Sequence, residues 1–161
     1  MQSLELKVPP PAVALLLAIA IAIAIAIAIW TVASGAGSVA VPAFIRIAVT
    51  AVLAAMSGGI SLAGVLAFRR ARTTVNPMKP ETTTALVTGG VYRITRNPMY
   101  VGLLILLVAW AVYLSSIWAL IGPILFMLYI TRFQILPEER ALLAMFGNTF
   151  AAYQTRVRRW L

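Results

Sequence analysis

The sequence predicts an all-α integral membrane protein with four transmembrane helices, a cytoplasmic connector and C-terminal amphipathic helices. Composition is the first observation behind this fold class: 62% of the 161 residues are hydrophobic and 11% are charged, whereas about one quarter of a soluble domain is charged. The second is the length of the apolar runs, several of which could cross a bilayer. The predicted spans are residues 11–31, 42–68, 99–114 and 117–136.

The first span begins with an uninterrupted apolar run over residues 11–30 and includes the interfacial residue Trp30. An α-helix rises 1.5 Å per residue, so about 20 such residues cover the roughly 30 Å hydrocarbon core of a bilayer. A cleaved signal peptide is the alternative, but the apolar region of a signal peptide is usually shorter. We therefore expect a membrane helix here.

The second span carries small residues at four-residue spacing, which would let a neighbouring helix approach closely: Ala55, Gly59, Ala63 and Ala67. The last two spans form a hairpin with Tyr113, Leu114, Ser115 and Ser116 at its tip. This hairpin returns the chain to the side of the membrane from which it entered.

The net charge of +9 is unevenly distributed along the chain. The connector, residues 69–98, and the C-terminal segment, residues 137–161, are both basic, whereas the loop between the first two spans is uncharged. Lys and Arg concentrate in cytoplasmic loops, so both termini are predicted to be cytoplasmic, and the short loops suit a prokaryotic inner membrane. Nucleic acid is not an expected partner, because the apolar surroundings do not suit it.

Pro137 permits a new helix to begin after the fourth span, with Glu138 and Glu139 in its first turn. Gly147 is expected to end that helix and to allow a second one to follow. The second helix has an apolar stripe and a basic remainder, so we expect it to lie along the membrane surface. The stripe consists of Phe150, Tyr153, Val157 and Leu161.

Missing residue types restrict the possible chemistry. The chain has no cysteine and no histidine, which removes disulfides, thiolate ligands, cysteine nucleophiles and histidine bases. No metal site is predicted. The carboxylate side chains are Glu5, Glu81, Glu138 and Glu139.

Two polar motifs flank the last hairpin, which should bring them to the same side of the membrane. The run from Arg96 to Tyr100 reads Arg-Asn-Pro-Met-Tyr and begins a helix, where free N–H groups suit a ligand carboxylate. Glu138 and Glu139 could hold a cationic amino group. Together the motifs suit a zwitterionic amino-acid moiety. Ordinary helix initiation and pairing of the glutamates with neighbouring arginines remain the alternatives.

These motifs carry a family resemblance over residues 79–161. The run Thr88–Gly102, the Pro137-Glu138-Glu139 triplet and the basic tail at residues 158–161 resemble the isoprenylcysteine carboxyl methyltransferase family. The Asn-Pro-Met-Tyr motif that begins at Asn97 is also similar to the related phosphatidylethanolamine N-methyltransferases. The resemblance implies an integral-membrane enzyme that uses S-adenosylmethionine and a lipophilic or lipid-modified substrate. The family's Arg-His-Pro element reads Arg-Asn-Pro here, and asparagine does not titrate near neutral pH.

The resulting assignments cover three groups of residues. The candidates for catalytic roles are Arg96, Asn97 and Glu138. The candidates for binding the cofactor are Gly89, Gly90, Tyr92, Arg96, Asn97, Pro98, Tyr100, Glu138 and Glu139. Arg93 is the candidate for binding an acceptor carboxylate.

The methyl acceptor is the open part of the functional prediction. A carboxylate acceptor needs no base, whereas an amine must first lose a proton, so the absence of histidine favours carboxyl O-methylation. Phospholipid amine N-methylation remains the main alternative. An NADPH-dependent membrane reductase, a channel and a non-catalytic membrane protein are further alternatives.

Overall fold

The computed structural model describes residues 25, 26, 28–71 and 86–161. These residues are mostly helical, and strand pairing among them is limited to isolated bridges. They belong to two compact units, Met1–Ala54 with Leu104–Tyr129 and Ala55–Leu103 with Ile130–Leu161. Most of the first predicted span lies outside the described residues, so that part of the four-span prediction remains a prediction.

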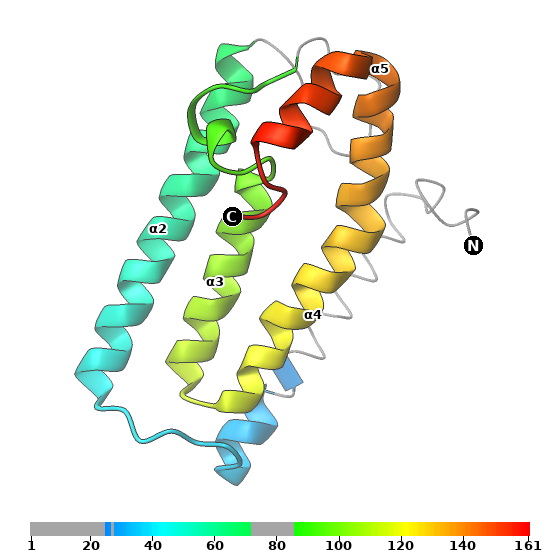
Figure 1. The fold of residues 1–161 in the computed structure, drawn as a ribbon. Helices are drawn as coiled ribbons and strands as arrows, with labels where there is room; N and C mark the ends of the chain where they lie inside the picture. Colours follow the sequence, from blue (N-terminus) through cyan, green and yellow to red (C-terminus); the bar gives the residue numbers. More distant parts are fainter. Residues whose placement is uncertain (1–24, 27, 72–85) are drawn as a thin grey trace. The chain divides into compact units, whose positions relative to one another are not determined.

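The first unit contains parts of three long helices, which Figure 1 labels α2 (Ala43–Arg70), α3 (Pro98–Leu114) and α4 (Ile121–Ile130). A short 3₁₀ helix, η4 (Ile117–Leu120), precedes α4. The loops before α2 and after α3 are joined by backbone hydrogen bonds: the Val39 N–H donates to the Ser115 carbonyl at 2.8 Å, and the Ile117 N–H donates to the Gly37 carbonyl at 3.0 Å. Of the four residues predicted at the hairpin tip, Tyr113 and Leu114 belong to α3. Ser115 and Ser116 form the connection to η4, and backbone hydrogen bonds join this connection to the loop before α2.

Gly37 provides a test of this connection. Its φ is +64°, and an added Cβ would lie 2.5 Å from the Trp118 ring, whereas Gly35 has a similar φ of +66° with nothing within 4 Å. Gly35→Ala should lower stability by about 1–2 kcal/mol through backbone strain. Gly37→Ala should cost about 1–3 kcal/mol more through overpacking. Equal thermal unfolding temperatures of the two variants in detergent would contradict this expectation.

The second unit contains the C-terminal part of α2 and the beginning of α3, which pack closely. The Ser57 hydroxyl donates to the Gly102 carbonyl at 2.8 Å, and a Cβ on Gly102 would overlap the Ser61 hydroxyl. The expected packing face was therefore wrong for this unit, because Gly59 is exposed and has no neighbour within 4 Å of an added Cβ. The face of α2 that meets α3 instead carries Ser57, Ser61 and Gly64.

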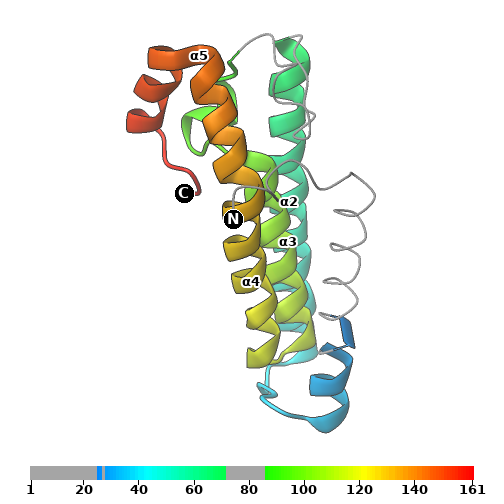
Figure 2. The ribbon, with the colours of Figure 1, turned by 90° about the vertical axis from the view of Figure 1, so that its right-hand side faces the viewer.

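The fourth predicted span continues into the C-terminal segment without a loop. The chain is helical from α4 through the π-helix η5 (Thr131–Ile135) into α5 (Leu136–Arg156), as Figures 1 and 2 show. Pro137 lies at the start of α5. A π-helix already interrupts the regular i→i−4 hydrogen bonding, so a proline directly after it is readily accommodated. The predicted helix start near Pro137 agrees with α5, which begins at Leu136 and carries Glu138 and Glu139 in its first turn, but this helix follows η5 directly.

Gly147 interrupts α5, as the sequence predicted, with φ 49° and ψ −126°. The chain turns at this residue, and the final part of α5 folds back (Figure 2). Phe150, Tyr153 and Val157 from the predicted surface stripe are buried against Leu142, Phe146 and other apolar residues of the same unit. The prediction that this stripe rests on the membrane surface was wrong, since the bend lets the stripe form a protein core instead.

Two stretches are long and apolar enough to cross a membrane: Ala43–Arg70 and Ile117–Arg156. Pro98–Leu114 is a shorter apolar helix. In each long stretch only 11% of the apolar segment is buried inside the protein, which differs from the core helix of a soluble protein. In the second stretch the uncharged apolar residues precede Glu138, so we place the acidic pair outside the membrane-spanning part.

Candidate active site in the second unit

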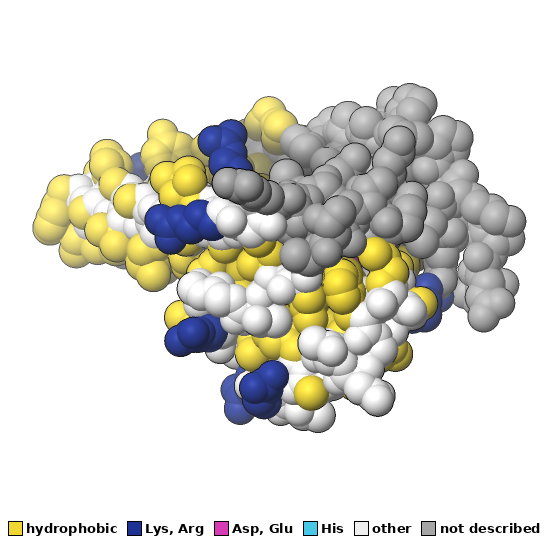
Figure 3. Space-filling model, turned by 90° about the horizontal axis from the view of Figure 1, so that it is seen from above, with side chains coloured by type: hydrophobic (Ala, Val, Ile, Leu, Met, Phe, Trp, Pro, Cys, Tyr) yellow, Lys and Arg dark blue, Asp and Glu magenta, His cyan; other side chains and the backbone are white. Residues whose placement is uncertain are grey.

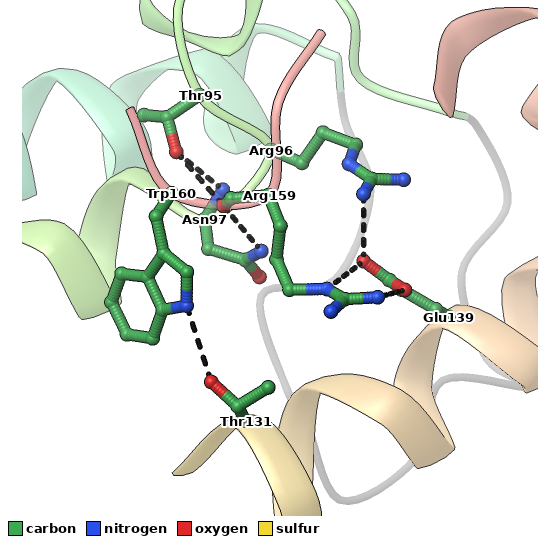
Figure 4. Close-up of polar contacts among 7 residues, drawn as sticks. All are labelled: Thr95, Arg96, Asn97, Thr131, Glu139, Arg159 and Trp160. Carbon is green, nitrogen blue, oxygen red and sulfur yellow. Dashed lines mark hydrogen bonds and ion pairs between the residues drawn. The ribbon is translucent and has the colours of Figure 1, made fainter. Parts of the chain in front are cut away.

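The centre of the site is a carboxylate held by two arginines. The Arg159 guanidinium donates to Glu139 through Nε to Oε1 at 3.0 Å and through Nη2 to Oε2 at 2.7 Å. Arg96 Nη2 lies 3.2 Å from the same Oε1. The side chains of Arg96 and Glu139 are each 11% exposed. Figure 4 shows the three side chains converging from the loop before α3, from α5 and from the C-terminal tail.

The tail beyond α5 is docked on the loop that precedes α3. The Arg159 carbonyl accepts hydrogen bonds from Asn97 Nδ2 at 2.9 Å and Thr95 Oγ1 at 3.2 Å, and the Arg96 N–H donates to the Arg158 carbonyl at 3.0 Å. Further along, Trp160 Nε1 donates to a threonine hydroxyl of η5 at 3.1 Å (Figure 4). The Asn97 amide therefore anchors the tail.

Several polar atoms beside this cluster are buried and have no hydrogen-bond partner. They are Nε and Nη1 of Arg96 and Oε2 of Glu138. Glu138 also hydrogen-bonds with the Tyr100 hydroxyl, which in turn interacts with Gln134 from η5. Buried polar atoms in native proteins are almost always paired. The unit therefore contains a buried cationic group and a buried anionic group that each retain hydrogen-bonding capacity.

The electrostatics of the two glutamates differ. Burial raises the pKa of Glu138 to about 7, the nearby Glu139 carboxylate adds to the rise, and the Tyr100 hydrogen bond opposes it. Burial lowers the pKa of Arg96, whereas its attraction to Glu139 counteracts that effect. The hydrogen bonds to Glu139 raise the pKa of Arg159. Glu139 thus forms ion pairs with two arginines, whereas Glu138 has an oxygen that can still accept a hydrogen bond.

The other predicted residues occupy different environments. Gly89 and Gly90 lie at the start of the 3₁₀ helix η3 (Gly90–Arg93). Tyr92 is buried, packs edge-on against Phe68 with ring centroids 5.5 Å apart, and accepts a hydrogen bond at its carbonyl from Tyr153. Burial, followed by the nearby Glu138, raises the pKa of the Tyr92 hydroxyl.

Pro98 and Arg93 have contrasting positions. Pro98 is buried at the start of α3 beside Gly64. Arg93 is exposed and, among the described residues, is not one of the arginines that form an ion pair with Glu139. The structure therefore brings together Arg96, Asn97, Tyr100, Glu138 and Glu139, but does not join Arg93 to them.

Sequence reasoning missed several members of this arrangement. Arg159 was recognised only as part of a basic tail, and no role was assigned to Thr95, Gln134 or Trp160. The available signal was the shortage of carboxylates, because a buried glutamate needs a cation and the tail offers several. Figure 3 shows exposed basic side chains and no acidic ones on the face in view, in agreement with the burial of Glu139 among the described residues.

The phospholipid methyltransferase family matches this chain over residues 45–149. The match covers more than half of the chain, and this protein belongs to that family. The chain is also 44% identical over 63 residues to an uncharacterized protein of Haemophilus influenzae, covering 39% of this chain and 100% of that relative. No solved structure matches it.

The family defines the protein broadly as a membrane methyltransferase, and the apolar helices agree with a membrane location. The family description concerns phospholipids, which suggests a lipid substrate. Within the described residues, no group of three or more His, Cys, Asp or Glu side chains could hold a metal ion.

Proposed function

We propose that this protein is an S-adenosylmethionine-dependent methyltransferase that modifies a lipophilic acceptor at the cytoplasmic face of a prokaryotic inner membrane. The observation that carries the proposal is that one compact unit contains buried Arg96 donors and a buried Glu138 oxygen, none of which has a hydrogen-bond partner. The basic connector and the basic C-terminal segment support the cytoplasmic orientation of both termini.

The methyl donor fits these residues through its amino-acid part. Arg96 would hold the donor carboxylate through a charge-assisted hydrogen bond from Nε or Nη1, the two buried nitrogens that have no partner. These nitrogens lie on different edges of the guanidinium, so each would meet a different atom of the ligand. Glu138 would hold the donor ammonium group with Oε2. Tyr100 orients Glu138 through their hydrogen bond. Gly89, Gly90 and Tyr92 would border the adenosine part.

S-adenosylmethionine, when bound, supplies a methyl group attached to a cationic sulfur. When the methyl group is transferred, the rest of the donor leaves as a neutral thioether. The protein's main contribution to such a transfer is alignment. Arg96 and Glu138 fix the donor end, and Glu139 and Arg159 hold Arg96 in place. Asn97 acts indirectly, by anchoring the tail that carries Arg159.

The acceptor has two candidates. Carboxyl O-methylation is favoured by the absence of histidine, because a carboxylate needs no base. Phospholipid amine N-methylation is supported by the description of the matched family and by a carboxyl group with a pKa near neutrality, since Glu138 could accept a proton at that pH. Arg93 on the surface remains a candidate for contacting an anionic acceptor.

Donor binding should depend on pH through Glu138. A carboxyl with a pKa of about 7 is mostly neutral at pH 6 and mostly charged at pH 7.5, while the donor's α-amino group stays largely protonated across this range. Calorimetric affinity for S-adenosylmethionine should therefore rise several-fold from pH 6 to 7.5. Glu138→Gln should remove this rise and weaken binding roughly tenfold at pH 7.5.

The same titration tests the class of enzyme. If the wild-type protein binds NADPH and no S-adenosylmethionine, the methyltransferase proposal fails in favour of a reductase. Transfer of a radiolabelled methyl group to prenylated carboxylates or to ethanolamine phospholipids, assayed in parallel, identifies the acceptor. Glu138→Gln is the matched variant, because the substitution keeps the size of the side chain and removes its charge.

A further inference from the structure

Arg159 lies outside the residues that match the family, because the match ends at residue 149. Its guanidinium nevertheless makes the shortest contact in the charged cluster, 2.7 Å from Nη2 to Glu139 Oε2. The tail that carries it is held independently through its backbone, because the Arg159 carbonyl accepts the bonds from Asn97 and Thr95. The Arg159 side chain can therefore be changed while the docking of the tail is kept.

The Glu139 carboxylate is shared unequally between the two arginines. Arg159 occupies both oxygens through two hydrogen bonds. Arg96 reaches only Oε1, with one nitrogen, and its Nε and Nη1 stay unpaired. An arginine and a carboxylate of this kind usually form a bidentate pair through two parallel hydrogen bonds. With Arg159 removed, Glu139 would be free to pair in that way with Arg96.

We propose that Arg159 is a positioning residue for donor binding: by occupying Glu139, it keeps that carboxylate from pairing bidentately with Arg96 and so leaves Arg96 Nε and Nη1 free for the donor. This inference rests on the proposed function. Arg159 itself contacts Glu139 and need not touch the donor.

The test is a double-mutant cycle with S-adenosylhomocysteine as the probe, measured by calorimetry on the full chain in detergent. Arg159→Ala should weaken binding by roughly tenfold, the loss expected for one charge-assisted contact. The same substitution in a Glu139→Gln background should have little effect, because a neutral amide no longer captures Arg96. A purely structural role for the tail would give the same loss in both backgrounds and would overturn the inference.

Arg158→Ala is the matched control, because Arg158 is the neighbouring residue, carries the same charge and is exposed. The affinity of the Arg158→Ala variant for S-adenosylhomocysteine should stay within about twofold of that of the wild type, since exposed charges contribute little. Arg159→Lys provides a second variant if Arg159→Ala does not fold: a single ammonium cannot occupy both Glu139 oxygens bidentately, so binding should fall by several-fold.

The outcomes separate this inference from the function on which it rests. Absence of probe binding to the wild-type protein would overturn the proposed function. Probe binding to the wild type, with Arg159→Ala equal to Arg158→Ala, would overturn only the role of Arg159. If Arg159→Ala weakens probe binding only in the protein that retains Glu139, the result supports both the proposed function and the role of Arg159.

Discussion

Arg96→Ala should weaken the binding of S-adenosylmethionine by at least about a hundredfold. The substitution removes two buried donors that have no partner in the protein, and two charge-assisted hydrogen bonds to different atoms of the ligand correspond to about 3 kcal/mol or more. Glu139 keeps both of its bonds to Arg159 in this variant, so the cluster should remain folded. Calorimetry and the KM for the donor in a methyl-transfer assay measure the effect.

The controls for this prediction come from the same chain. Arg96→Lys preserves the charge but not the planar fork, so its affinity should lie between those of Arg96→Ala and the wild type. Arg156→Ala removes an exposed arginine whose Nε donates to the Ala152 carbonyl of its own helix, and its donor affinity should be unchanged within about twofold. If Arg96→Ala binds the donor as tightly as the wild type, the assignment of Arg96 to the donor site is wrong.

Glu139→Ala should cause the largest loss of stability among the substitutions at the site. It leaves Arg96 and Arg159 close together without their shared carboxylate. Removal of one partner from a buried ion pair typically costs about 3–5 kcal/mol, because the remaining charge is left uncompensated. Thermal unfolding in detergent at pH 8 should show a clearly lower midpoint for this variant.

The adjacent glutamate supplies the comparison for that measurement. Glu138 has a buried oxygen without a partner and a raised pKa, so its charged form is destabilising at pH 8 in the absence of a ligand. Glu138→Gln should therefore unfold at the same temperature as the wild type or slightly higher. As the pH falls from about 7 towards the pKa of a glutamate in the unfolded chain, about 4.3, the penalty shrinks steadily and the advantage of Glu138→Gln should disappear. Equal destabilisation by Glu138→Gln and Glu139→Ala would contradict the distinct roles of the two residues.

Much of the fold could be predicted from apolar runs and from residues that begin or end helices. The predicted range 42–68 corresponds to α2 at Ala43–Arg70, and 99–114 corresponds to α3 at Pro98–Leu114. The interruption at Gly147 was predicted from its residue type alone. Such features are local, because hydropathy and backbone freedom act over a few neighbouring residues. The π-helix η5 was missed, because its signal is the tertiary packing around it rather than a local pattern.

The candidate site was likewise predicted only in part, because its residue types are local features and their contacts are not. Scarcity of acidic residues directed attention to Glu138 and Glu139, and the helix start directed it to Arg96. Nothing in the spacing could distinguish the two glutamates, since neighbours on a helix differ only in the direction in which they point. The position of Arg159 beside Glu139 determined that distinction. The apolar stripe around Tyr153 was likewise assigned to the membrane, because the sequence does not reveal which surface covers an apolar face.

The sequence by itself determined that this chain is helical and apolar, and which residue types could bind a charged small molecule. Its hydropathy and its few carboxylates were sufficient for those conclusions, because both are properties of short segments. Only the tertiary structure decided that Glu139 is occupied by two arginines and that Glu138 and Arg96 retain free bonding capacity. The physical reason is that pairing depends on contacts between residues far apart in the chain, such as Arg159 and Glu139, which local sequence patterns do not encode.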